Sequence, residues 1–325
     1  MLITENLGKV YKSKIRKGLF QSERVEIDAV KSLNLELREG QIVGLLGING
    51  AGKTTSIKML STLLEPTKGR GEIDGLDLVK DEKRIKKMIN MIAGGERMIY
   101  WRLTAKENLW YYGNLYDVPK DILKKRIDEL LSLVGLTEAK DTPVERYSKG
   151  MKQRLQIARG LINNPNYIFM DEPTLGLDAP IAKELRDYAR RLAYDEDRAI
   201  LLTSHYMHEV EELCEYIYVL DKGALIAEGT PAQLASIAST EKVLRVELNR
   251  LSKPTQNSLD LLCQKAGATL EILNNNTSVE LVIKSIDDIS SEIAATLSTH
   301  HAPIRSFYID KPKLEDAIIK LSRRN

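Results

Sequence analysis

Short, largely apolar runs recur through the first 230 residues, and they predict buried strands. The intervening stretches, such as 148–163 and 180–194, carry apolar residues at helical spacing and predict helices. Apolar strands that alternate with helices are typical of a parallel sheet covered on both faces, so we expect an α/β fold. The strands expected in this part of the chain are 1–11, 25–37, 41–46, 71–75, 89–93, 167–170, 199–203, 216–220 and 224–229.

A block of helical character interrupts this alternation between residues 104 and 163. It opens with Thr104-Ala105-Lys106-Glu107, which fits a capping box at a helix start. Residues 119–134 place their apolar side chains on one side, as an amphipathic helix does. We therefore expect a helical subdomain inserted into the α/β core.

The pattern changes after residue 238, where strands and helices follow the order β-α-β-β-α-β and end in one more helix. That order predicts a ferredoxin-like, split-βαβ arrangement. We expect two domains, 1–238 and a smaller α+β domain at 239–325. The elements expected here are strands 242–248, 269–273, 279–283 and 304–309, and helices 256–266, 286–297 and 314–321.

Composition narrows the function classes. The 325 residues are 43% hydrophobic and carry a net charge of only +2, so nothing demands a nucleic-acid partner. The two cysteines, Cys214 and Cys263, stand in unrelated contexts, which argues against a metal cluster and suits a reducing compartment. No apolar run is long enough to span a bilayer and the N-terminus does not read as a signal peptide, so we expect membrane contact only through a partner.

The stretch between the strand at 41–46 and the helix expected at 56–64 matches the phosphate-loop pattern G-x-x-x-x-G-K-[ST]. Its glycines let backbone N–H groups surround phosphates, and the following helix directs its positive end at them. Lys53 is expected to reach the β- and γ-phosphates and the Thr54 hydroxyl to hold Mg²⁺. The expected nucleotide-binding residues here are Gly47, Asn49, Gly50, Ala51, Gly52, Lys53, Thr54 and Thr55.

Two acids follow the apolar strand 167–170. The carboxyl end of that strand is expected beside the phosphate loop. Asp171 is then placed to contact Mg²⁺, directly or through water, and Glu172 to activate the attacking water. The alternative is that these acids only cap an ordinary strand end. The phosphate loop upstream favours the catalytic interpretation over this alternative.

Ser148 opens the helix at 148–163. A serine-capped helix start with a nearby glycine, Gly150, can bind an anion. The residues alone support a plain helix cap equally well.

Together these motifs resemble the ATP-binding subunit of an ABC transporter, over roughly residues 1–228. The phosphate loop corresponds to Walker A, Asp171 and Glu172 end Walker B, and Tyr147-Ser148-Lys149-Gly150-Met151 stands at the signature. Leu175-Gly176-Leu177-Asp178 resembles the D-loop and Thr203-Ser204-His205 the switch. The resemblance implies a P-loop NTPase fold with a parallel core sheet, an antiparallel β subdomain and an inserted helical subdomain.

The same resemblance implies further roles. His205 would contact the γ-phosphate, and Tyr11 would stack on adenine. Two such domains would pair head to tail, so that Ser148 and Gly150 bind the ATP held by the other copy. The catalytic set is then Glu172, His205 and Lys53, the metal set is Thr54 and Asp171, and the cofactors are ATP and Mg²⁺.

Three departures from the family pattern stand out. Lys149 and Met151 replace a glycine and a glutamine of the signature. Gly95, with Glu96 beside it, occupies the position where the family carries a glutamine that senses Mg²⁺ and water. The basic stretch 12–24 is longer than the usual turn.

The segment Phe307-Tyr308-Ile309-Asp310-Lys311-Pro312 and the residues after it are similar to the tail of ATPases that serve ABC-2-type exporters. This favours an export ATPase that binds a separate permease, as a homodimer or heterodimer, at the cytoplasmic face of the cell membrane. Two alternatives stay open: a soluble ABC ATPase that acts on ribosomes or DNA, and a weakly catalytic regulatory ATP binder.

Overall fold

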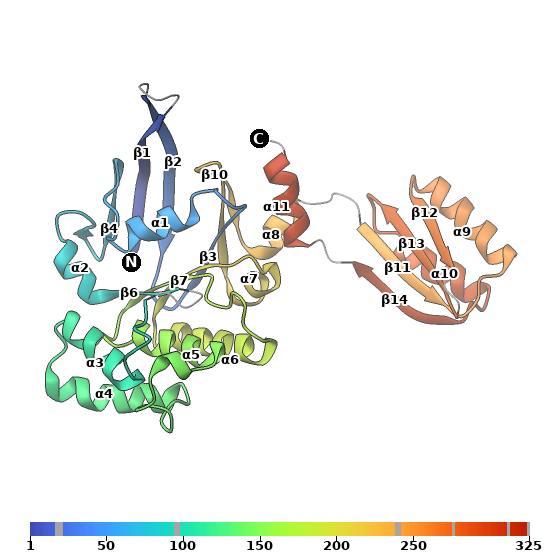
Figure 1. Cartoon of the computed structure of the whole chain (residues 1–325). Helices are drawn as coiled ribbons and strands as arrows, with labels where there is room; N and C mark the ends of the chain where they lie inside the picture. Colours follow the sequence, from blue (N-terminus) through green and yellow to red (C-terminus); the bar gives the residue numbers. More distant parts are fainter. Residues whose placement is uncertain (17–21, 94–97, 238–241, 275–276, 311–312, 324–325) are drawn as a thin grey trace. The chain divides into compact units, whose positions relative to one another are not determined.

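The computed structural model describes the whole chain except residues 17–21, 94–97, 238–241, 275–276, 311–312 and 324–325. It divides into two compact units, Met1–Pro231 and Ala232–Arg324. Each unit is built around its own sheet (Figure 1). The boundary expected after residue 238 stays a prediction.

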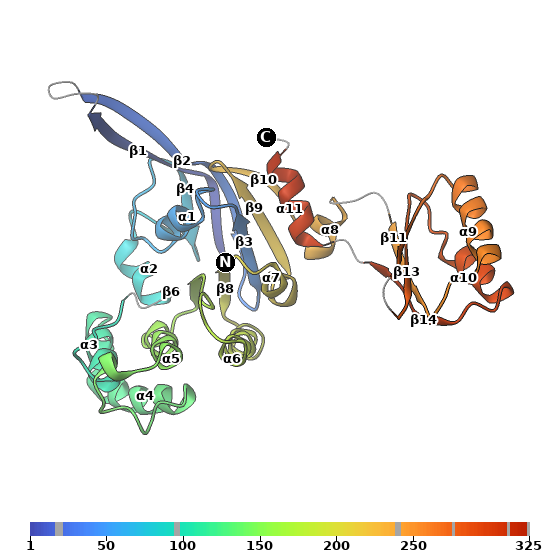
Figure 2. The same ribbon diagram turned by 45° about the vertical axis from the view of Figure 1, so that its right-hand side comes forward.

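The first unit is organised by a ten-stranded sheet in the order β5-β4-β1-β2-β10-β9-β3-β8-β7-β6. Strands β9, β3, β8, β7 and β6 run parallel, whereas β1, β2, β4 and β5 are antiparallel. Strands β1 and β2 project beyond the other strands in both views (Figures 1 and 2). The strands are β1 (Leu2–Arg16), β2 (Ser22–Leu37), β3 (Ile42–Gly47), β4 (Lys68–Ile73), β5 (Leu76–Asp77), β6 (Ile89–Ala93), β7 (Tyr167–Asp171), β8 (Ala199–Thr203), β9 (Tyr216–Asp221) and β10 (Ala224–Gly229).

Helices surround this sheet, and α3, α4 and α5 gather into the predicted helical block (Figure 1). The block begins where the capping box predicted it: Thr104 accepts from the Glu107 backbone, and the Glu107 side chain accepts from the Thr104 backbone. The helices of this unit are α1 (Lys53–Leu60), α2 (Glu82–Met88), α3 (Ala105–Leu115), α4 (Lys120–Leu133), α5 (Lys149–Gly160), α6 (Ala179–Arg190) and α7 (Met207–Leu213), with a 3-10 turn at Val144–Arg146 and a π turn at Arg191–Asp195. Helix α8 (Pro231–Ser236) begins at the last residue of this unit and otherwise belongs to the second.

Helix α1 differs from the expectation at both ends. It begins at Lys53 instead of Ser56, because Gly52 takes a left-handed conformation that ends the phosphate loop there. It ends at Leu60, and the backbone of Thr62 has a positive φ of 55°, which no α-helix continues. Helix α5 likewise ends at Gly160, three residues before the predicted end.

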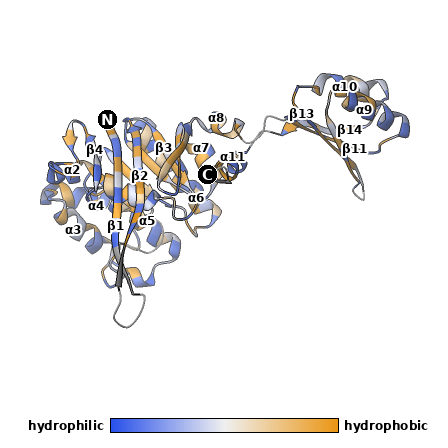
Figure 3. Cartoon of the chain, turned by 90° about the horizontal axis from the view of Figure 1, so that it is seen from above, coloured by the Kyte–Doolittle hydropathy of each residue, from blue (hydrophilic) through white to orange (hydrophobic). Residues whose placement is uncertain are grey.

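A hydrophobic core fills the space inside the curved sheet. Leu45, Ile57, Tyr167 and Phe169 are fully buried there. Burial of such side chains contributes roughly 1.5–3 kcal/mol each, so this core fixes the strand ends that carry polar groups. Figure 3 shows orange, hydrophobic positions along central strands such as β3 and blue positions on exposed helices such as α3.

The second unit contains a four-stranded antiparallel sheet in the order β12-β13-β11-β14. This is the order of the predicted split-βαβ arrangement, and α9 and α10 pack through buried residues such as Leu259 and Ile293. Helix α10 begins at Ser290, four residues later than expected. The elements are β11 (Lys242–Leu248), α9 (Lys253–Lys265), β12 (Thr269–Asn274), β13 (Val279–Ser285), α10 (Ser290–Thr299), β14 (Ile304–Asp310) and α11 (Leu314–Arg323).

Candidate active site

The phosphate loop connects β3 to α1, as predicted. Gly47 and Gly52 have positive φ angles of 154° and 106°. A Cβ atom at Gly47 would lie 2.3 Å from the Leu220 carbonyl oxygen, and one at Gly52 would lie 2.5 Å from that of Ala29. Only glycine fits these two positions, so β2 and β9 enforce the shape of the loop.

Lys53 is the first residue of α1 and is only 6% exposed. Its Nζ donates to the carbonyl oxygens of Gly47 at 2.7 Å and Ile48 at 3.3 Å. Burial lowers the pKa of Lys53, although the carboxylates of Glu172 and Asp171 act in the opposite direction. The loop therefore folds around an ammonium group that faces two acids.

The other predicted loop residues differ in their exposure. Ala51 is buried, and its N–H donates to the Ile48 carbonyl at 3.1 Å. Asn49 and Thr54 are exposed, whereas Thr55 is half-buried. Within the part of the chain that the structure describes, no side-chain hydrogen bond caps the start of α1, which leaves its first N–H groups directed at the loop.

Asp171 stands at the carboxyl end of β7, where β8 is the neighbouring parallel strand and Thr203 is its register partner. The Thr203 hydroxyl donates to Oδ1 of Asp171 at 2.7 Å. This bond fixes the carboxylate rotamer beside Lys53. The sequence motifs alone do not predict this role for Thr203.

Glu172 follows with a positive φ of 52°, an uncommon conformation for a residue with a side chain. Its N–H donates to the Thr203 carbonyl at 3.0 Å and to the Thr203 hydroxyl at 3.1 Å, which holds the backbone in place. Its Oε1 lies 2.6 Å from Nε2 of His205. The two predicted catalytic groups therefore meet, on segments that follow adjacent strands.

Ser148 is the N-cap of α5 and accepts from the Met151 N–H at 3.2 Å. A Cβ on Gly150 would lie 2.3 Å from Cδ1 of Ile181, so α5 approaches α6 closely there. No hydrogen bond among the described residues of the chain joins Ser148 or Gly150 to the phosphate loop. A single copy therefore does not bring the predicted signature contacts to the Lys53 site.

Tyr11 lies on β1 opposite Ile27 of β2 and is 38% exposed. Nζ of Lys9 lies 5.9 Å from the centre of its ring. Ala29, two residues beyond Ile27, contacts Gly52, so β2 links Tyr11 to the phosphate loop. Gly95 lies outside the described residues, and so does the tip of the basic stretch, residues 17–21.

A second group of polar residues, which the sequence analysis missed, lies behind Glu172 and His205. Glu209 of α7 is 5% exposed, and its carboxylate accepts from Thr174, Ser204 and Arg186. The sequence offers only an indirect signal for this buried cluster: Thr174 and Ser204 stand within two residues of the predicted catalytic groups Glu172 and His205.

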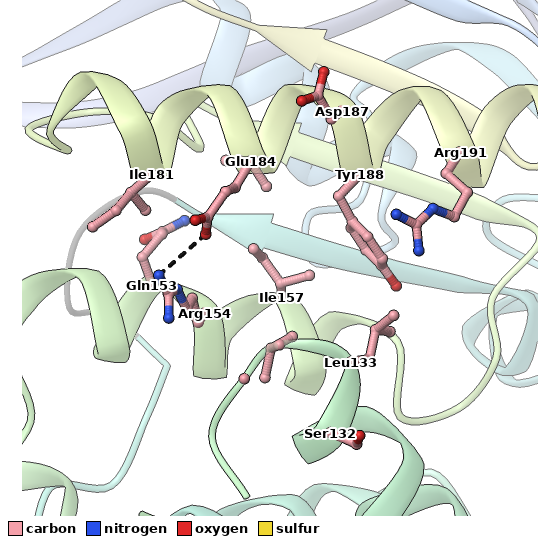
Figure 4. Close-up of a pocket in the computed structure, with 13 residues that line it drawn as sticks. Ser132, Leu133, Gln153, Arg154, Ile157, Ile181, Glu184, Asp187, Tyr188 and Arg191 are labelled. Carbon is pink, nitrogen blue, oxygen red and sulfur yellow. Dashed lines mark ion pairs between the residues drawn. The ribbon is translucent and has the colours of Figure 1, made fainter.

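A cavity of about 470 Å³ lies between α4, α5 and α6, away from the phosphate loop (Figure 4). Arg154 of α5 and Glu184 of α6 form an ion pair of 3.1 Å at its wall. Gln153 also lines it and is buried, with its Nε2 lacking a hydrogen-bond partner among the described residues. None of the predicted site residues lines this cavity. Two of its walls are formed by α5, which begins at the signature, and α6, which follows the D-loop.

The family model described as ABC transporter matches residues 30–175. Among the curated relatives, the ABC transporter ATP-binding protein NatA of Bacillus subtilis is 38% identical over 71% of this chain and 94% of its own length. The linearmycin resistance ATP-binding protein LnrL of the same organism is 30% identical over 100% of this chain and 99% of its own. The daunorubicin/doxorubicin resistance ATP-binding protein DrrA of Streptomyces peucetius is 33% identical over 90% and 88%.

Among solved structures, a dimeric ATP-binding cassette in a post-hydrolysis state, bound to ADP and Pi, has a TM-score of 0.61 at 26% identity. The match covers 71% of this chain and 98% of that one. The ATP-binding subunit of an ABC transporter matches with a TM-score of 0.60 at 26% identity, over 72% of this chain and 91% of its own.

Proposed function

This chain belongs to the ATP-binding proteins of ABC transporters, and we propose on that premise that it hydrolyses ATP with Glu172 and His205 to drive export through a separate membrane subunit. The ATPase activity itself follows from the family. The observation that carries the residue assignment is the approach of Glu172 to His205, 2.6 Å apart, beside the Lys53 loop.

In this proposal Lys53 and the loop N–H groups bind the β- and γ-phosphates. Glu172 accepts the proton of the attacking water, and its fixed backbone orients that water for in-line attack. His205 donates a hydrogen bond to the γ-phosphate, which stabilises the charge that develops there. Tyr11 stacks on the adenine ring, since its ring is exposed on a strand that is tied to the loop.

The Asp171 and Thr54 side chains fit Mg²⁺. Both offer oxygen ligands, which Mg²⁺ prefers, and the Thr203 hydroxyl orients the Asp171 carboxylate. The described residues contain no cluster of three or more His, Cys, Asp or Glu side chains able to hold a metal ion. That agrees with an ion that one or two protein groups share with the phosphates of ATP. The bound ion would neutralise charge on the transferred phosphoryl group.

Ser148 and Gly150 are assigned to the ATP of a second ATPase subunit. The lack of a hydrogen bond from Ser148 or Gly150 to the phosphate loop among the described residues favours this, and the dimeric ADP-bound structure is a precedent. The Ser148 hydroxyl and the free N–H groups of α5 would then bind the γ-phosphate from the opposite side. Loss of the γ-phosphate removes these contacts and lets the dimer open.

An exposed aromatic surface formed by α3 and the residues just before it is the proposed docking site for the membrane subunit. Four aromatic side chains are 41–47% exposed there, and Leu115 is 64% exposed. Leu115 also borders an apolar cavity of about 310 Å³ between the helical block and β6. Exposed apolar patches of this kind mark interaction sites, and a short amphipathic helix of the permease fits such a groove. The aromatic residues are Tyr100, Trp101, Trp110 and Tyr111.

Export is favoured by the relatives, whose names refer to linearmycin and daunorubicin/doxorubicin resistance. No described helix combines the length and apolar character needed to cross a membrane. The proposed binding to a permease is the ground on which we place the subunit at the cytoplasmic face of the membrane.

Co-purification from detergent-solubilised membranes tests the docking site. The variant Leu115→Glu is expected to lose the membrane protein that co-purifies with the wild type, while its basal ATPase activity persists. Leu261→Glu, at a leucine of α9 that is 55% exposed, is the matched control and should retain it. Equal recovery by both variants would reject this surface, and recovery of the wild type with ribosomes would reject the transporter role.

A further inference from the structure

Glu209 connects the two turns that carry the proposed catalytic pair. Its carboxylate is buried behind them, on α7, and is not expected to touch ATP. Thr174 stands two residues after Glu172, and Ser204 immediately precedes His205. The Thr174 hydroxyl donates to Oε2 of Glu209 at 2.7 Å, and the Ser204 hydroxyl donates to the same oxygen at 2.9 Å. If either turn shifts, it therefore moves Oε2 of Glu209, which is also the hydrogen-bond acceptor for the other turn.

Each hydroxyl also belongs to the turn that it anchors. The Ser204 Oγ also accepts from the Tyr206 N–H at 3.0 Å. This bond joins the residue that precedes His205 to the residue that follows it. The Thr174 carbonyl accepts from the Leu177 N–H at 3.0 Å, within the turn that follows Glu172. Movement of these side chains is thus transmitted to the backbone next to the catalytic groups.

The cluster is closed to water and charged. Thr174, Ser204 and Glu209 are 3%, 2% and 5% exposed. Arg186 of α6 donates to Oε1 of Glu209 at 3.3 Å and balances its charge. A buried ion pair of this kind adds little stability over an apolar replacement of similar volume. Hydrogen-bond networks in a low-dielectric interior restrict geometry strongly.

We propose that Glu209 is a positioning residue that holds Glu172 and His205 at their working distance by anchoring both turns through one carboxylate oxygen. The inference rests on the proposed function, since it presumes that these two groups act on ATP. Arg186 extends the same network to α6, which begins directly after the predicted D-loop. The position of that loop is therefore linked to the Glu172–His205 pair.

A double-mutant cycle on the two hydroxyls tests this directly. Thr174→Val and Ser204→Ala each remove one bond and leave the catalytic groups in place. Each is expected to lower kcat by about tenfold or more with little change in KM for ATP, because misplacement affects the chemical step and not the Lys53 loop. Since both act through Glu209, the double variant should lose no more than the larger single loss. Thr174→Ser keeps the hydroxyl and should restore kcat.

Glu209→Gln provides a second measurement. Its amide oxygen can still accept both hydroxyl bonds, whereas Glu209→Leu accepts neither. We expect kcat to stay close to wild type for the first variant and to fall like the hydroxyl variants for the second. Thr255→Val, at a threonine that is 2% exposed in the second unit, is the control for loss of a buried hydroxyl and should leave kcat unchanged.

The outcomes separate the two proposals. Fully multiplicative losses of kcat, or unchanged kcat with only a lower melting temperature, would overturn the positioning role while wild-type hydrolysis still supports the proposed function. A wild-type rate that does not depend on Glu172 would instead overturn the proposed catalytic pair. If Glu209→Leu fails to fold, the hydroxyl cycle alone decides.

Discussion

Oε1 of Glu172 lies 2.6 Å from Nε2 of His205, although the two residues are more than thirty positions apart. The distance results from the adjacency of β7 and β8, because Asp171 and Thr203 are register partners at the ends of these strands. The turn after each strand then directs one side chain toward the other.

Replacement of Glu172 by glutamine should abolish turnover and preserve ATP binding. The amide cannot accept a proton from water, so we expect a loss of roughly 10²–10⁴-fold in kcat. The check is phosphate release at saturating ATP, with nucleotide affinity measured in parallel. Glu271→Gln, an exposed acid of β12, serves as the control. An unaltered rate would remove Glu172 from the role of base.

Lys53→Ala should weaken ATP binding more than ADP binding, because the lost ammonium is assigned to the β- and γ-phosphates. Titration calorimetry with each nucleotide measures both affinities. Lys58→Ala removes an exposed lysine from the same helix and should leave them unchanged. Wild-type affinity for ATP in Lys53→Ala would contradict the assignment of the phosphate loop.

Gly52→Ala should disturb the phosphate loop more than a positive φ alone would. The added Cβ would lie 2.5 Å from the Ala29 carbonyl oxygen, so backbone must move. Gly267→Ala is the matched control, since Gly267 also has a positive φ but nothing within 4 Å of the new atom, and its cost should be about 1–2 kcal/mol. Thermal unfolding and ATP affinity compare the two. Similar effects of both changes on ATP affinity would show that the contact with Ala29 is unimportant.

Glu212→Gln should reduce stability in a pH-dependent way. Hydrogen bonding to Arg190 lowers the pKa of Glu212 from its ordinary value of 4.5, and Arg186 adds to this effect. The stabilisation is therefore present above about pH 4.5 and is lost as the pH falls through the lowered pKa. We expect the variant to melt below the wild type at pH 7, by the equivalent of about 1 kcal/mol or less, and the gap to close in acid. A gap that is the same at both pH values would show that this ion pair does not contribute.

Much of the α/β core could be predicted from the sequence, because a buried strand is visible there as a short run of apolar residues. The apolar runs at Ala199–Thr203 and Ala224–Gly229 correspond to strands with the same bounds. The capping box at Thr104 set the start of α3 correctly, since side-chain capping depends only on neighbours in the chain. The phosphate loop was recognised for the same reason.

Features that depend on contacts between residues far apart in the sequence could not be predicted as well. The helix after the loop was expected at Ser56, where its apolar spacing begins, but the left-handed Gly52 starts it at Lys53. Glu209 is one of several acids on a short helix, and nothing in the local pattern separates it from the exposed Glu211. Its burial arises only when α7 packs behind the ends of β7 and β8.

The central claim is that ATP joins the phosphate loop of one copy to Ser148 of another. Light scattering on the Glu172→Gln protein, with and without Mg²⁺ and ATP, tests it most directly. One chain has a mass of 36.7 kDa, and we predict twice that mass with ATP and a single-chain mass without it. The added change Ser148→Arg should prevent the increase. A single-chain mass with ATP demonstrably bound would contradict the account.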